Sequence, residues 1–247
     1  MIFMDWEMEE FDETDVQEGN LEHVLKMARK DVHEIIRGVD LAIEHLNLIY
    51  RLCEEVADDT LHAAPENQKT RHNLARLYHY TGRLAGEIYF HNSEIEWARR
   101  WNQYLNLALT TDGDDSQNFT MFLSKHIGYS AKILFFRDGE RLEMALEWFE
   151  MHRQAGRMLN GYIASQGTED NRLELLNATM WESATHAARV MHRNTNSGKW
   201  KAKCEECAMR GKAASNHIPS EQRREIIEKL RGHLNAIMSP DVPELYF

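Results

Sequence analysis

The 247-residue sequence contains little proline or glycine, with 4 Pro and 13 Gly. It also has no convincing run in which apolar and polar residues alternate over the length of a strand. Since such alternation is typical of half-buried strands, its absence argues against a sheet-rich fold. Leu, Ala, Glu, Met and Arg are abundant, and all favour helix. The sequence therefore predicts an all-α protein.

Cysteines and long apolar runs are also scarce. Three cysteines, Cys53, Cys204 and Cys207, are too few for a disulfide framework, which fits a reducing compartment. No apolar run is long enough to cross a bilayer, and the acidic start does not resemble a secretory or mitochondrial leader. We expect a soluble protein of the cytoplasm or the nucleus, without a membrane partner.

Positive charge is in deficit. The 29 Lys and Arg residues are outnumbered by 40 Asp and Glu, which gives a formal net charge of −11 at pH 7. This balance favours solubility and disfavours binding to a phosphate backbone. We expect no nucleic-acid partner.

Apolar residues at helical spacing, separated by polar or glycine-containing turns, predict successive helices. The predicted ranges are 21–36, 40–56, 68–92, 93–109, 118–137, 140–159, 172–193, 200–215 and 220–238. Asp40 is expected to cap the second helix. These helices form one domain over residues 20–238, and residues 239–247 form a C-terminal tail.

Residues 1–19 form a separate N-terminal segment that mixes acidic and large apolar residues. Such acidic-aromatic segments commonly bind other surfaces. Phe3, Trp6 and Phe11 are the candidate anchors. The segment could dock on its own chain, on a partner or on another copy, and the last case would make a homo-oligomer.

Residues 74–109 carry the most specific pattern in the chain. Small residues, aromatic residues and a large aliphatic residue recur at helical spacing on either side of a polar break at Asn92 and Ser93. They are Ala85, Gly86, Tyr89, Ala98, Trp101 and Leu105. Small residues let two helices approach, and aromatic residues fill the remaining space. This pattern resembles a divergent tetratricopeptide repeat (TPR), and residues 127–149 match it in part.

The resemblance implies TPR-like antiparallel helical hairpins stacked as a right-handed α-solenoid, with the last helix as a C-terminal cap. The spacing between the hairpins is irregular and longer than the usual period of about 34 residues, so an unrelated helical bundle is the alternative. A TPR-like solenoid implies a non-catalytic adaptor or scaffold without a cofactor. It would bind a peptide or protein segment in its concave groove.

Candidate peptide-binding residues follow from the first helix of each hairpin. On the helix of residues 68–92, side chains three or four positions apart share a stripe, and later helices offer comparable positions. The candidates are Arg76, Tyr80, Arg83, Glu87, His91, Lys125, Lys132 and Asn177. A mixed, partly basic groove of this kind suits an acidic or carboxylate-ended peptide. The alternative is a solvated helix face.

Metal and catalytic sites are not predicted. Two sets have helical spacing that could gather a metal, but neither belongs to the paired Glu-x-x-His arrangement of di-iron bundles. The sets are Glu87, His91 and Glu94, and Glu147, Glu150 and His152. Cys204 and Cys207 have the spacing of half a zinc site without the other half, so core contacts are the simpler interpretation.

The alternative function is that of an all-helical enzyme or small-ligand-binding protein. Its pocket would lie between hairpins and be lined by aromatic side chains. The candidates are Trp97, Trp101, Tyr104, Trp148 and Trp181. Residues of this type at helical spacing are more often core, and an enclosed cavity with convergent polar groups would distinguish the two.

Overall fold

The computed structural model describes residues 20–62, 68–111, 117–166 and 170–238. The acidic-aromatic segment 1–19 and the tail 239–247 lie outside the described residues. Within the described ranges there is no strand, and no helix is long and apolar enough to span a bilayer. The prediction of an all-α fold is confirmed.

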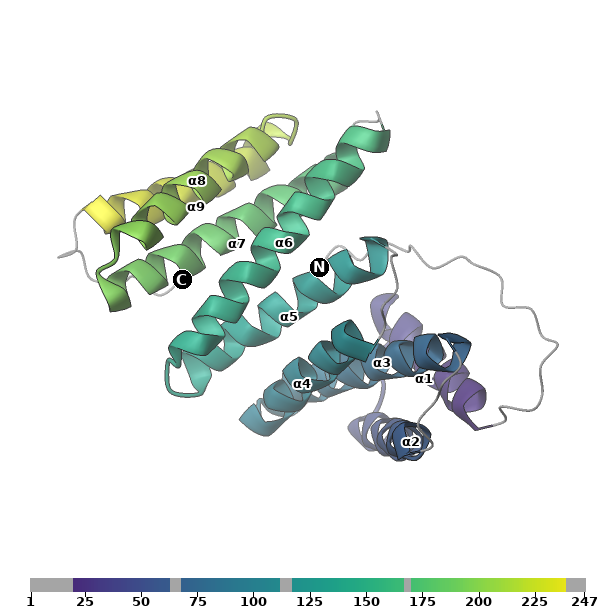
Figure 1. Ribbon diagram of the computed structural model, residues 1–247. Helices are drawn as coiled ribbons and strands as arrows, with labels where there is room; N and C mark the ends of the chain where they lie inside the picture. The colour runs from purple at the N-terminus through teal and green to yellow at the C-terminus, as the bar shows by residue number, and fades with distance from the viewer. Residues whose placement is uncertain (1–19, 63–67, 112–116, 167–169, 239–247) are drawn as a thin grey trace. The chain divides into compact units, whose positions relative to one another are not determined.

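Nine helices make up the described part of the chain (Figure 1). They are α1 (Leu21–Ile36), α2 (Ile43–His62), α3 (Gln68–Asn92), α4 (Ile95–Thr111), α5 (Gln117–Arg137), α6 (Leu142–Gln166), α7 (Asn171–Thr195), α8 (Gly198–Ala214) and α9 (Ser220–Met238). The predicted ranges for α1, α3 and α9 coincide with the observed ones, and the others differ at their ends.

The largest local difference is at the start of α2. The helix begins at Ile43, so Asp40 lies before its first turn, and the prediction that Asp40 caps this helix is wrong. The left-handed backbone of Gly38, at φ +83°, keeps the preceding residues in a turn, and helical hydrogen bonding starts with Leu46 N–H donating to the Ala42 carbonyl. Asp40 instead places Oδ1 3.7 Å from Nε2 of His91.

The polar break between α3 and α4 is confirmed. Ser93 has φ 59°, a left-handed conformation that ends α3. The side-chain oxygen of Asn92 then accepts a hydrogen bond from the backbone N–H of Glu94 at 3.0 Å. The chain therefore reverses at the two residues where the sequence pattern changes.

The chain divides into two compact units, with the boundary between Ser130 and Ala131 inside α5. The first unit contains α1 to α4 and the first part of α5. The second contains the rest of α5 and α6 to α9 (Figure 1). Within the first unit α3 packs on α1, α2 and α4, and within the second α7 packs on α6, α8 and α9. Each unit is therefore built around one long central helix.

Small residues let α3 and α4 approach closely in the first unit. A Cβ atom added at Gly82 would lie 2.9 Å from Cδ2 of Leu105, and one added at Gly86 would lie 2.9 Å from Cδ2 of Trp101. Real Cβ atoms do not reach such distances without movement of a neighbour. The predicted packing of small residues against large ones between these two helices is confirmed.

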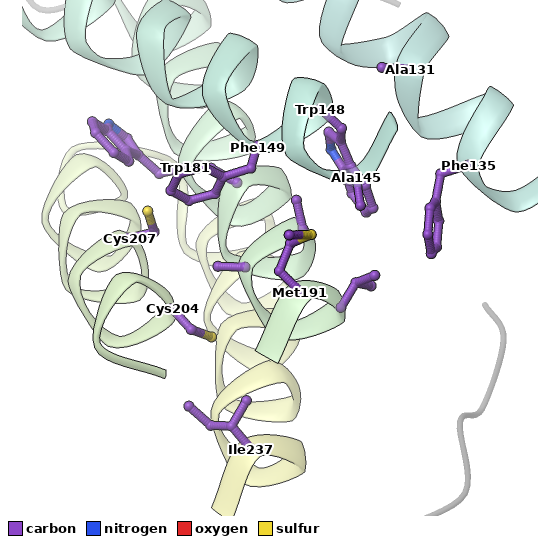
Figure 2. Packing of buried hydrophobic residues seen from close by; sticks show 14 residues of the cluster. Ala131, Phe135, Ala145, Trp148, Phe149, Trp181, Met191, Cys204, Cys207 and Ile237 are labelled. Carbon is purple, nitrogen blue, oxygen red and sulfur yellow. The ribbon is translucent and has the colours of Figure 1, made fainter. Parts of the chain in front are cut away.

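In the second unit, too, a glycine packs against a large side chain of the core, and Figure 2 shows the buried residues of that core. Trp181 of α7 is fully buried, and a Cβ atom added at Gly156 of α6 would lie 2.8 Å from its Cε2. Cys204 and Cys207 of α8 are buried in the same cluster, and the Cys204 thiol donates a hydrogen bond to the Thr185 carbonyl at 3.5 Å. Their interpretation as core contacts is confirmed.

Candidate functional site

The eight predicted peptide-binding residues are divided between the two units, and their environments differ. Lys132 and Asn177 belong to the second unit, and the other six belong to the first. Along the α3 stripe, Tyr80 and Arg83 are buried, Arg76 and Glu87 are partly exposed, and His91 is exposed. The stripe is therefore buried in its middle and more exposed towards both ends.

Arg83 of α3 makes polar contacts with side chains of both α3 and α5. Its Nη1 donates a hydrogen bond to Nε2 of His126 on α5 at 3.0 Å. Its Nη2 lies 3.8 Å from Oε1 of Glu87, one turn further along α3. The guanidinium carbon is 5.7 Å from the ring centroid of Phe122. Three kinds of contact thus fix this buried cation between α3 and α5.

Lys125 brings a second cation to the same aromatic ring. Its Nζ lies 5.0 Å from the centroid of Phe122, and the His126 ring lies 4.4 Å from it. Cations are attracted to the faces of aromatic rings at such distances. We call Arg83, Lys125, His126, Phe122 and Glu87 the Arg83–Lys125 cluster.

Burial dominates the electrostatics of the Arg83–Lys125 cluster. Desolvation lowers the pKa of Arg83 to about 10, an effect opposed by the charge of Glu87. Desolvation, and then repulsion from Arg83, lowers the pKa of Lys125 to about 8. Burial also raises the pKa of Glu87, which Arg83 and His91 counteract. The environment penalises both positive charges, so it would favour an added anion.

The two predicted residues of the second unit have separate surroundings. Lys132 Nζ lies 5.3 Å from the ring centroid of Trp148, and burial lowers the pKa of this lysine. Asn177 is buried, and its side-chain amide donates a hydrogen bond to Oδ1 of Asn160 on α6. Within the second unit these two residues therefore have different partners.

A second cluster, in the second unit, was missed by the sequence analysis. Within the described ranges, Glu182, His186 and His233 form the one group of three donors whose ligand atoms all lie within 4.8 Å of one another. His233 Nε2 and Glu182 Oε1 are 2.7 Å apart, and the two imidazole rings stack at 4.6 Å between centroids. We call this the Glu182–His186–His233 cluster.

Cations and aromatic rings surround this second cluster. Arg189 Nη2 donates a hydrogen bond to His186 Nε2 at 3.0 Å, and the Trp148 ring lies 4.9 Å from the His186 ring. Burial, and then the charges of His233, Arg189 and Lys132, lowers the pKa of His186 to about 2. The His186 imidazole is therefore neutral at physiological pH.

Part of this cluster could have been found from the sequence. Glu182 and His186 are four residues apart, the spacing that brings two side chains onto one face of a helix. His233 lies 51 residues from Glu182 and belongs to another helix, so spacing alone does not connect it. Only the packing of α9 on α7 brings it close.

The two metal sets considered from the sequence do not converge among the described residues. α3 ends at Asn92, which puts Glu94 outside the helix of Glu87 and His91. His152 is fully buried, and its Nδ1 is hydrogen-bonded to the Ser183 hydroxyl at 2.8 Å. The Ser183 hydroxyl also accepts a hydrogen bond from Trp148 Nε1, so His152 belongs to a buried polar network.

The aromatic residues considered for a ligand pocket are also divided between the units. Trp97, Trp101 and Tyr104 belong to the first, and Trp148 and Trp181 belong to the second. Trp148 and Trp181 are fully buried, and Trp101 is 5% exposed. These three side chains are core residues of their own units.

Comparisons with known proteins found no matching family model and no matching curated protein. Among solved structures, the chain is similar to a computationally designed self-assembling cyclic homooligomer, with 11% identity, 89% of this chain and 95% of that chain covered, and a TM-score of 0.39. It is also similar to the DHF58 filament, with 15% identity, a TM-score of 0.33, and coverage of 88% of this chain and 94% of that one. A third similar structure is the de novo designed helical repeat protein DHR64, with 18% identity, a TM-score of 0.33, and coverage of 90% of this chain and 96% of that one. At these TM-scores the likenesses support no inference about function.

Proposed function

We propose that the protein is a non-catalytic interaction module that binds an acidic segment of a partner protein. The carboxylates of that segment would be bound at the Arg83–Lys125 cluster. The observation that carries this proposal is the convergence of two buried cations, from two helices, on the ring of Phe122.

The charge balance of the cluster favours a carboxylate ligand. Arg83 and Lys125 repel each other, which contributes to the lowered pKa of Lys125, in a chain whose formal net charge is −11. An added carboxylate would offset the repulsion between Arg83 and Lys125, and charge-assisted hydrogen bonds to guanidinium and ammonium groups are strong. Selectivity for an acidic segment would follow from relief of this repulsion.

The cluster also has partly exposed groups that a peptide could approach. Phe122 and Glu87 are partly exposed, as is Arg76, two turns before Arg83 on α3. A peptide side chain could therefore pack on the Phe122 ring while its carboxylate reaches Arg83. Such a pairing of an apolar contact with a few placed polar groups is typical of peptide recognition.

The TPR-like interpretation supports the same proposal. The α3–α4 hairpin has the small-to-large packing that the family uses, at Gly82 with Leu105 and at Gly86 with Trp101. In a TPR-like solenoid the first helix of a hairpin contributes to the binding groove, and Arg83 lies on that helix. The reduced, buried cysteines fit an intracellular partner.

Fluorescence anisotropy with defined peptides tests this function. The probe is a labelled Glu-rich peptide with a free terminal carboxylate, and its control has Gln for every Glu and an amidated terminus. The full chain is expected to bind the acidic peptide only. R83Q/K125Q is expected to weaken that binding by more than about tenfold, because both buried charges that receive the carboxylates are lost.

Matched variants and a second probe complete the test. K30Q/R99Q also removes one lysine charge and one arginine charge, but from exposed positions of the first unit. This variant is expected to bind the acidic peptide like wild type. K125Q alone serves if circular dichroism shows that the double variant is unfolded. Equal binding of the acidic and neutral peptides, or unchanged binding by a folded R83Q/K125Q, would overturn the proposal. A labelled peptide of residues 1–19 tests whether the chain's own acidic segment is such a ligand.

A further inference from the structure

The Glu182–His186–His233 cluster shares no residue with the proposed peptide site. Glu182 and His186 lie one turn apart on α7, and His233 is brought to them by α9. The side chains of His233 and Glu182 are only 11% and 14% exposed. Three potential metal ligands therefore lie together and are partly shielded from solvent. An isolated histidine on the surface has neither property.

The chemistry of the three donors suits a transition metal. Two imidazole nitrogens and one carboxylate are a ligand set of catalytic zinc sites, whereas calcium and magnesium prefer oxygen donors. Ligand atoms bound about 2.0 to 2.2 Å from one ion lie roughly 3.3 Å apart in a tetrahedron. The donor atoms lie within 4.8 Å of one another. Because the two imidazole rings stack at an interplanar angle of 25°, at least one ring would have to rotate for both nitrogens to face the same ion.

The contacts of the cluster show how its lone pairs are directed. His186 Nε2 accepts a hydrogen bond from the Arg189 guanidinium, so this lone pair already faces a cation. Glu182 holds His233 Nε2 at 2.7 Å. A metal ion would take the place of the Arg189 hydrogen bond at His186 and of the proton between His233 and Glu182.

We propose that Glu182, His186 and His233 form a binding site for a divalent transition-metal ion of the zinc class. Three protein ligands leave a coordination position for water or a further ligand. The aromatic rings of Trp148 and Phe136 stand beside His186, 4.9 and 5.9 Å away between centroids, and would restrict access to one side of the ion. The neighbouring cations Lys132 and Arg189 would lower the affinity below that of a structural zinc site.

Cobalt(II) and zinc(II) titrations of the full, untagged, chelator-treated chain test this site. Cobalt(II) is expected to produce the visible absorption of a tetrahedral site at about one ion per chain, and zinc(II) is expected to abolish it by displacement. Zinc(II) is also expected to raise the melting temperature, because it binds the folded state. E182Q and H233Q are expected to weaken binding by about tenfold or more, because each loses a ligand.

The variants separate this site from adventitious binding by other histidines. E182Q is nearly isosteric and retains an acceptor for His233, so it tests the ligand set in a folded chain. H45Q is the matched control, since His45 Nε2 lies 3.0 Å from Asp31 Oδ2 in a pair with only two donors. Unchanged cobalt absorption in folded E182Q and H233Q would overturn the proposal, as would an equal loss in H45Q. Absence of cobalt absorption in the wild-type chain would also overturn it.

Discussion

Lys125 makes the stability of the protein depend on pH. Burial holds its pKa at about 8 in the folded chain, and its ordinary value is 10.5. Between these values the unfolded chain binds more protons than the folded chain. The contribution of this lysine to the free energy of unfolding therefore rises with pH across that window.

The variant K125M tests this dependence. It removes the penalty of burying an ammonium group, so we expect it to be more stable than wild type at pH 7. The stability difference is expected to shrink by about 2 kcal/mol on raising the pH to 10, because wild-type Lys125 loses its proton there. Urea unfolding at each pH measures both proteins, and groups common to both cancel. A pH-independent difference would contradict the lowered pKa, and K30M controls for loss of an exposed charge.

For single residues, the sequence identifies which charged side chains are candidates for the site, but not which side chains they contact. Helical spacing predicts that Arg83 and Glu87 are neighbours on one face, and their ion pair agrees. The hydrogen bond from Arg83 to His126 joins residues 43 positions apart, and no spacing rule predicts it. Nor does a stripe on a helix reveal burial, because burial depends on which helices cover it.

Between elements, the distance from α6 to α7 depends on glycine at position 156. We expect G156A to be destabilised by roughly 1 to 3 kcal/mol, because its new methyl group would meet the Trp181 ring at 2.8 Å. This cost exceeds the gain in helix propensity, which is at most about 1 kcal/mol. Thermal and urea unfolding measure the difference.

Gly161 of the same helix provides the control. A Cβ atom there would meet nothing within 4 Å, so G161A gains helix propensity without a clash and is expected to be slightly more stable than wild type. If G156A proved as stable as G161A, the close approach of the two helices would be contradicted.

Helix positions were predictable because periodicity and turn residues agree over most of the chain. The break at Asn92 and Ser93 has both a polar pair and a left-handed residue, and the predicted ends of α3 match. The start of α2 was predicted wrongly. Asp40 is of a residue type that favours helix caps, but the helix begins three residues after it. The chain turns at Gly38 and α2 begins only at Ile43, so Asp40 lies outside the helix and near His91.

At the scale of the whole chain, each of the two units has its own core. Destabilisation of one core is expected to open that unit selectively, because cooperative opening follows contiguous packing. G86A, whose methyl group would meet Trp101 at 2.9 Å, is expected to increase amide hydrogen exchange in α3 and α4. Exchange in α7 and α8 is expected to stay as in wild type.

Hydrogen-exchange mass spectrometry of peptides from each unit measures this. G156A provides the reciprocal experiment, with faster exchange expected in α6 and α7 but not in α3. A uniform increase across both units in either variant would show that they open together. The division at Ser130 was not predictable from sequence, because α5 continues through it as one helix and Gly128, two residues before the division, lies inside that helix.

The placement of tryptophans against glycines also gives each unit an optical reporter. Trp101 is seated on Gly86 in the first unit, and Trp181 is seated on Gly156 in the second. Indole emission shifts to longer wavelengths when water reaches the ring. The tryptophans of one unit can be replaced by phenylalanine. The emission wavelength of the remaining tryptophans would then record the opening of the other unit in real time.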